Sequence, residues 1–145
     1  MTNFDIIGVL RTYAASKGWV FLSGAEAYQN YEISQSELPT NKIIMGVRFT
    51  AQPVIRNKSV VSIRYIGVVM LGQKKETTTI SELDETFIQK YDRRLLALST
   101  LLSTTIGEVA CNNELDVGNV NFEMILNRFD ENIDCVDATL TLVQG

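Results

Sequence analysis

The residues most suggestive of chemistry are the closely spaced acids of the run Asp130–Asp134. The run Asp-Glu-Asn-Ile-Asp opens as a calcium-binding loop does, with oxygen-bearing side chains at its first, third and fifth positions. The next position, which needs glycine in such a loop, is Cys135, and the twelfth, which needs glutamate, is Thr141. The run also falls where we expect a hairpin turn. We therefore interpret it as a solvated turn, with a cation site as the weaker alternative.

The residues that most enzymes use are scarce. The chain has no histidine, which is the commonest general base and the usual partner of a serine or cysteine nucleophile. Its two cysteines, Cys111 and Cys135, do not make a standard zinc site without histidine, and they suit a reducing compartment. An enzyme would need a carboxylate pair in one cleft, such as Asp134 and Asp137, and no other reactive group accompanies these two. We expect no catalytic activity, no metal and no cofactor.

Charge is the strongest pattern, because the net charge of -4 conceals two oppositely charged stretches. Residues 41–75 include seven bases and no acid, whereas residues 108–145 include eight acids and one base. Opposite charges of this kind can join two segments of one fold, or one copy of a protein to the next. We predict a subunit or partner interface with bases on one side and acids on the other. The basic residues are Arg48, Arg56, Lys58, Arg64, Lys74 and Lys75, and the acidic residues are Asp130, Glu131, Asp134 and Asp137.

The basic stretch could face one of three environments. Its bases alternate with apolar residues, so Arg48 and Arg64 are expected on one positive face. A chain with a pI of about 4.8 is a poor dedicated DNA binder. We favour contact with an acidic protein surface, and the alternatives are contact with nucleic-acid phosphate and a simply solvated face.

Length and hydropathy predict a single domain with a packed core, since the chain has 145 residues of which 46% are hydrophobic. No apolar run approaches the roughly 18 residues of a membrane helix. The opening residues lack the basic region of a secretory signal. We therefore expect a protein made and kept in a cytoplasm, with neither a membrane nor a small molecule as its partner.

Two helices and two hairpins should position the charges. Helical spacing of apolar residues predicts a helix over 3–16, with Asn3 as its N-cap and Gly18 as its stop. A short strand at 19–22 and a polar loop at 23–42, the segment most expected to be mobile, should follow.

Residues 43–52 and 60–72 alternate as paired strands, and their faces indicate the register. A two-residue turn at Asn57-Lys58 would by itself set Ala51 opposite Arg64 and mix the faces. A three-residue loop, or a bulge near Pro53, restores matching faces. The predicted pairs are then Ala51–Tyr65, Val47–Val69 and Phe49–Gly67, the last with the ring over the bare glycine. Arms of about 12 residues, roughly 40 Å long, could project beyond the domain or curl over the core as a sheet edge.

The strongest helix is expected over 84–106, ended by Gly107, with Lys90, Arg93 and Arg94 outside its apolar stripe. Alternation over 120–127 and 136–142 predicts a second hairpin that turns at 129–132. The sequence therefore predicts a single α+β domain. It comprises one antiparallel sheet with long hairpins, packed against a long amphipathic helix and an N-terminal helix.

Four segments carry a family resemblance: the opening helix Phe4–Lys17, the hairpin Ile43–Leu71, the helix Asp84–Ile106 and the closing strand Cys135–Val143. Their order resembles that of the tail-terminator and tail-completion proteins of tailed bacteriophages. The resemblance implies a structural ring subunit without catalytic activity, usually in a hexamer, that closes the tail tube and joins it to the head connector. It implies tail-tube or connector proteins as partners, passive contact with DNA in the lumen, and a virion location after assembly in the bacterial cytoplasm. A neck or connector ring, or another small virion protein, is the alternative within this group.

A ring needs head-to-tail contacts between copies. A basic hairpin that docks on the acidic hairpin of the next copy would supply them. The alternative from another class is a small adaptor, monomeric or dimeric, that binds an acidic protein through the same basic hairpin.

Overall fold

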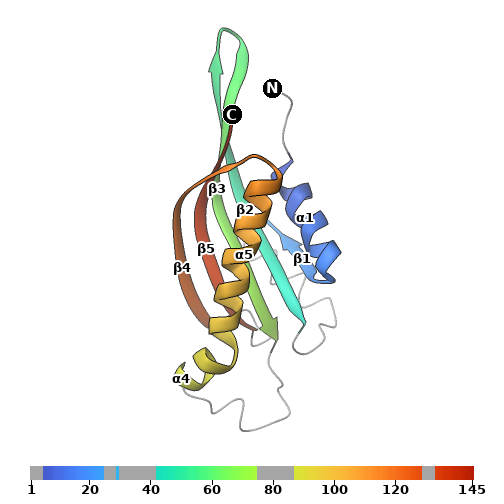
Figure 1. Cartoon of the computed structure of the whole chain (residues 1–145), viewed down its shortest axis with the longest axis vertical. Coiled ribbons are helices and arrows are strands. Elements are labelled where there is room, and N and C mark those ends of the chain that lie inside the picture. The colour runs from blue at the N-terminus through green and yellow to red at the C-terminus, as the bar shows by residue number, and fades with distance from the viewer. Residues whose placement is uncertain (1–4, 25–28, 30–41, 75–86, 129–132) are drawn as a thin grey trace.

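A computed structural model describes residues 5–24, 29, 42–74, 87–128 and 133–145, and confirms the predicted α+β fold (Figure 1). Five strands form one sheet in the order β1-β2-β3-β5-β4. The helices are α1 (Ile6–Lys17), α4 (Phe87–Lys90) and α5 (Leu96–Asn112), with a π-helical turn at Tyr91–Leu95. The strands are β1 (Val20–Ser23), β2 (Ile43–Arg56), β3 (Ser59–Lys74), β4 (Asp116–Arg128) and β5 (Ile133–Gln144).

The sheet is mixed, so the prediction of a wholly antiparallel sheet is wrong. β1 pairs with β2 in parallel, from Val20 opposite Ile44 to Ser23 opposite Val47. Parallel neighbours need a connection of a dozen or more residues, and the chain between β1 and β2 is long enough to provide one. Most of the polar loop predicted at 23–42, including its predicted mobility, lies outside the described residues.

Helix α1 begins one turn later than predicted, because Asp5 is its N-cap. The Asp5 carboxylate accepts a hydrogen bond from the Gly8 backbone N–H at 2.8 Å, which satisfies one of the free donors of the first turn. Gly18 ends the helix in the left-handed conformation at φ 73°, as predicted. The predicted cap Asn3 lies outside the described residues.

The predicted register of the first hairpin is confirmed. Ala51 lies opposite Tyr65, Val47 opposite Val69 and Phe49 opposite Gly67. The chain combines two of the features that the sequence offered, a two-residue turn at Asn57-Lys58 and a bulge between Val54 and Ile55. Both turn residues have positive φ, 50° and 64°, as a primed hairpin turn requires.

The long helix differs from its prediction in its first described turns and at its C-terminal end, and its predicted start at residue 84 lies outside the described residues. It continues through Gly107 to Asn112, and its first turns include the π-helical turn Tyr91–Leu95. A π turn holds more residues than an α turn, so it changes which residues face the sheet. Lys90 and Arg94 were predicted outside but are buried, with 5% and 7% of their surfaces exposed.

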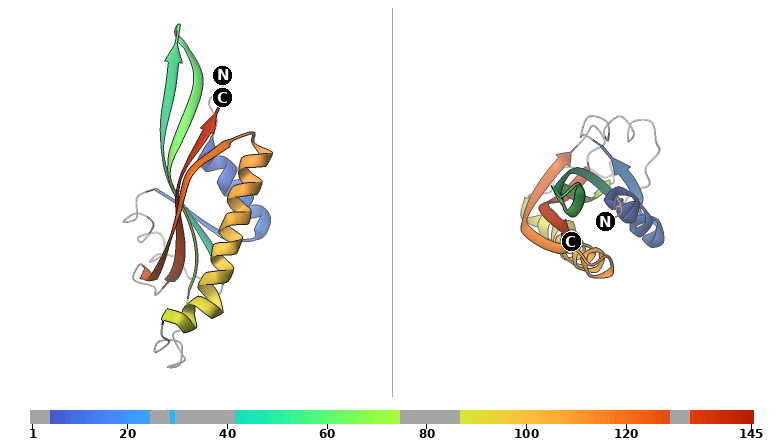
Figure 2. Two further views of the ribbon diagram at one scale, coloured as in Figure 1. Left: turned by 60° about the vertical axis from the view of Figure 1, so that its left-hand side comes forward. Right: turned by 90° about the horizontal axis from the view of Figure 1, so that it is seen from above.

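Both faces of the sheet carry apolar residues. Helices α1 and α5 cover one face, where they bury the main core with side chains from β2, β3 and β5 (Figure 2). We call this the helix face and the opposite one the outer face. A smaller buried cluster lies on the outer face: Leu22, Ile44, Met70, Ile133 and Cys135.

Candidate assembly interface

The β2–β3 hairpin projects beyond the rest of the fold, as both side views show (Figures 1 and 2). The pairing of β5 with β3 ends where Gln144 lies opposite Ile63, and the pairing of β1 with β2 ends at Val47. Residues 54–62 therefore form a two-stranded ribbon, which we call the tip. Two-stranded ribbons are marginal alone, so the tip depends on the longer hairpin behind it.

Three of the predicted interface bases share the outer face of this hairpin. Arg48 and Gln52 point to the same side of β2, and Gln52 lies opposite Arg64, so Arg64 points there too. Arg48 and Arg64 are thus about 13 Å apart along the strands at ~3.3 Å per residue. Arg56 follows on the same side, and all three are exposed. The predicted positive face is therefore present on the outer face, with Arg48 and Arg64 in the sheet and Arg56 in the tip.

The remaining predicted bases do not all join that face. Lys58 lies in the exposed turn at the tip. Lys74 lies at the opposite end of β3, half-buried and opposite Ile133. Lys75 lies outside the described residues.

The tip also exposes apolar side chains, which the sequence-based interpretation did not single out. Ile55 is 62% exposed, and Val54 and Val61 are each 41% exposed. Apolar groups gathered on a projecting element commonly mark a contact with another molecule. Alternation predicts which side each side chain takes. That no described third strand or helix covers them follows only from where β5 ends relative to β3.

The predicted acidic face is corrected for two of its four residues. Asp134 has no exposed surface and Asp137 has 7%. The Asp134 carboxylate lies 3.4 Å from the Arg94 guanidinium of the π-helical turn, inside the same chain. These two carboxylates are therefore not available at the surface. Asp130 and Glu131 lie outside the described residues.

The same two residues do not form a catalytic pair. They are three positions apart on one strand, so their side chains point to opposite faces of the sheet. Asp134 faces the helices, whereas Asp137 shares the outer face with Cys135, whose Sγ lies 4.0 Å from its Oδ1. Among the described residues, no group of three or more His, Cys, Asp or Glu is placed to hold a metal ion.

An apolar groove between α5 and the edge strand β4 was not predicted. Its volume is about 300 Å³. It is lined by Ser103, Ile106, Gly107, Val117, Val120 and Phe122. The three β4 side chains are between 38% and 41% exposed. The one sequence feature that could have indicated this groove is Gly107 inside a helical pattern. A glycine has no side chain to cover the neighbouring strand, so it leaves part of that strand exposed.

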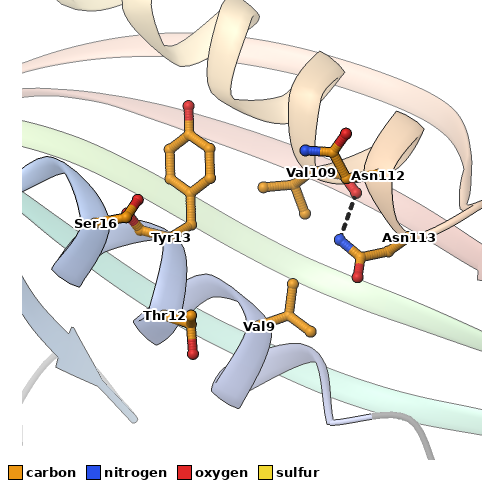
Figure 3. Close-up of a pocket in the computed structure, with 7 residues that line it drawn as sticks. All are labelled: Val9, Thr12, Tyr13, Ser16, Val109, Asn112 and Asn113. Atoms are coloured by element: carbon orange, nitrogen blue, oxygen red, sulfur yellow. Dashed lines mark hydrogen bonds between the residues drawn. The ribbon is translucent and has the colours of Figure 1, made fainter.

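A second groove lies between α1 and the end of α5, with a volume of about 320 Å³ (Figure 3). It is lined by Val9, Thr12, Tyr13, Ser16, Val109, Asn112 and Asn113. The Tyr13 hydroxyl donates to the Glu108 carboxylate at 2.5 Å, and its ring packs edge-on against Trp19. Burial, and then the hydrogen bond to Glu108, raise the pKa of Tyr13. The Asn113 amide donates to the Val109 carbonyl at 2.8 Å. The bond between Tyr13 and Glu108 ties α1 to α5, whereas that between Asn113 and Val109 closes the end of α5. The groove holds hydroxyls and amides rather than a nucleophile with its base.

No protein-family model matches this chain, and no curated protein is significantly similar to it. In the described part of the chain, no helix combines the length and the hydropathy needed to cross a bilayer.

Proposed function

We propose that this protein is a non-enzymatic structural subunit that assembles with copies of itself, as a ring at a phage tail or head–tail junction. The observation that carries the proposal is the projecting β2–β3 hairpin. Its strands have 14 and 16 residues, more than twice the usual five or six, and within its tip only Val60 is found packed against the core among the described residues. A rigid arm of this kind suits contact with a neighbouring subunit.

The charges of the arm favour a protein partner. Arg48, Arg56 and Arg64 share one exposed face, which Val54 also joins, whereas the adjacent Ile55 points to the other side of the ribbon. Exposed aliphatic side chains gain little from a phosphate backbone, whereas an apolar core with a polar rim is typical of protein–protein interfaces. An arm on one side and its acceptor on another give head-to-tail contacts, which form a ring when the rotation between successive copies closes.

The resemblance to tail-terminator and tail-completion proteins supports the more specific part of the proposal. It suggests a hexamer within the virion, with tail-tube or connector proteins above and below, and passive contact with DNA in the lumen. The α+β fold and the long hairpin are compatible with that role.

The first test is the absolute mass of the purified protein by light scattering at low and at high salt. We expect a particle of several subunits that dissociates as salt rises, because exposed charge pairs are screened. The double variant Arg48→Glu/Arg64→Glu should stay folded and monomeric. The double variant Arg11→Glu/Lys42→Glu changes the net charge equally at exposed positions away from the tip, and it should assemble normally.

A wild-type monomer at both salt concentrations would contradict self-assembly of the free protein. It would favour the adaptor alternative, in which the same basic face binds an acidic protein of another kind. Normal assembly of the Arg48→Glu/Arg64→Glu variant would remove these arginines from the interface.

A further inference from the structure

We propose that the groove between α5 and β4 receives the tip of the β2–β3 hairpin from a second copy of this chain. This inference rests on the proposed self-assembly and names the surface that completes it. The donor residues are Val54, Ile55 and Val61, and the acceptor residues are Ile106, Gly107, Val117, Val120 and Phe122.

The two surfaces match in hydropathy. The donor presents aliphatic side chains at the end of a narrow ribbon, and the acceptor is an apolar trough of about 300 Å³, within the range of binding pockets. Val117, Val120 and Phe122 point toward the helix side of β4 but lie too near the sheet edge for α5 to cover them. Each surface therefore leaves apolar area in water that the other could bury.

The two surfaces also match in charge. Residues 42–74, which form the donor hairpin, include six bases and no acid. Residues 96–128, which contain α5 and β4, include one base, Arg128 at the end of β4, and four acids: Glu108, Glu114, Asp116 and Glu123. All four are exposed. Glu108 bonds to Tyr13 on the α1 side of α5, and Asp116 and Glu123 alternate with the groove-lining residues of β4, so they point to the outer face. These acids surround the acceptor rather than line the groove, and their attraction for a tip carrying Arg56 and Lys58 would steer the encounter of two copies.

The donor and acceptor of one copy lie apart. The tip extends past the ends of α5 and β4 in both side views (Figures 1 and 2). A projecting tip that is complementary to a groove elsewhere on the same molecule makes a heterologous contact, which propagates from copy to copy.

Strand addition at the sheet edges is the less suitable contact. The edge strand β4 has two irregularities, between Gly118 and Asn121 and between Ile125 and Arg128. The free edge of β2 contains Pro53, which lacks a backbone donor. Bulges and proline are the features by which edge strands resist pairing with another chain. Docking of side chains into the groove does not require either edge.

The test is complementation between two damaged subunits, measured as mass by light scattering at low salt. Ile55→Asp damages only the tip, and Val120→Asp damages only the groove. Each alone should associate at least about 30-fold more weakly than the wild type, the effect of losing an interface hot spot. In an equal mixture, the intact tip of the Val120→Asp subunit can enter the intact groove of the Ile55→Asp subunit. The expected product is a particle of two subunits and no larger.

Two further variants secure the result. Ile88→Asp is the matched control for Ile55→Asp, because Ile88 is 65% exposed and lies on α4; it should assemble as the wild type does. Ser103→Glu damages the groove from the exposed surface of α5, and it replaces Val120→Asp if that variant does not fold.

The outcomes separate the two proposals. A wild-type monomer would overturn both of them. A wild-type ring whose damaged subunits stay monomeric when mixed would overturn the groove assignment alone, as would a folded Val120→Asp or Ser103→Glu variant that assembles normally. A mixture that gives the two-subunit particle supports the assignment.

Discussion

The buried pair of Arg94 and Asp134 should contribute to folding rather than to assembly. The guanidinium and carboxylate lie 3.4 Å apart, and their side chains are only 7% and 1% exposed. Replacing one partner leaves the other charged in a site with little water, which typically costs about 3–5 kcal/mol. We therefore expect Asp134→Asn or Arg94→Met to lower the free energy of unfolding by about that amount, a large share of the roughly 5–15 kcal/mol of a typical domain.

Replacing both partners with apolar residues should recover most of the loss. Exchanging a buried ion pair for hydrophobic side chains of similar size is often neutral or stabilising. The double variant Arg94→Met/Asp134→Leu should thus be more stable than Asp134→Asn alone. The difference between the double variant and the sum of the two single changes, Arg94→Met and Asp134→Leu, measures the coupling of the pair, including any coupling through their shared neighbours.

The assay is urea denaturation followed by circular dichroism, with the midpoint compared at an unchanged slope. A loss below about 1 kcal/mol for Asp134→Asn would refute the reasoning, because removing one partner of a buried ion pair typically costs about 3–5 kcal/mol. A variant that keeps wild-type stability but fails to assemble would instead return Asp134 to the interface that the sequence predicted.

Three other changes test local features of the fold. Gly67→Ala should lower stability by about 1–3 kcal/mol in urea denaturation, since a Cβ there would lie 2.8 Å from the Phe49 ring and closer still to the opposing backbone; an unchanged midpoint would contradict the tight pairing. Lys58→Gly should raise the urea midpoint by relieving a positive φ of 64°, worth about 1 kcal/mol, and a lower midpoint would contradict this turn. Tyr13→Phe should cost about 1 kcal/mol at neutral pH through the lost hydrogen bond to Glu108. The pKa of Tyr13 is raised above 10.0, so its protonated form stabilises the fold below that pH, and this stabilisation is lost as the pH rises through the raised value. In alkali, the melting temperature of Tyr13→Phe should therefore fall less than that of the wild type.

The register of the first hairpin could be predicted because its information is local. Strand side chains alternate with a period of two, so only pairings that match the faces bury Val47 opposite Val69. The turn at Asn57-Lys58 and the bulge together satisfy that condition. The alternation of side chains could not predict that the tip projects, because the projection depends on where β5 ends relative to β3.

The errors arose where a distant contact overrides a local pattern. Gly107 signals a helix end, yet α5 continues through it to Asn112, because a single glycine costs only about 1 kcal/mol in a helix whose other face is packed on the sheet. Arg94 has the sequence environment of a solvent-facing arginine, and only the presence of Asp134 on the facing strand explains its burial. The groove between α5 and β4 likewise depends on how far the helix reaches toward the sheet edge.

The charge split that the sequence displays is divided between two tasks in the fold. Strand β5 of the acidic stretch pairs directly with β3 of the basic stretch, from Ile63 opposite Gln144 to Lys74 opposite Ile133, so the two hairpins meet within one chain. The acids of β5 are buried within the fold and are not available to another copy, since Asp134 pairs with Arg94 and Asp137 is buried on the outer face. The acids of α5 and β4 stay exposed, and so do the bases near the tip. Among the described acids of this stretch, those of α5 and β4 rather than those of β5 are therefore left to join one copy to the next. Charge reversal at Asp116 or Glu123 should weaken assembly without the loss of stability expected at Asp134.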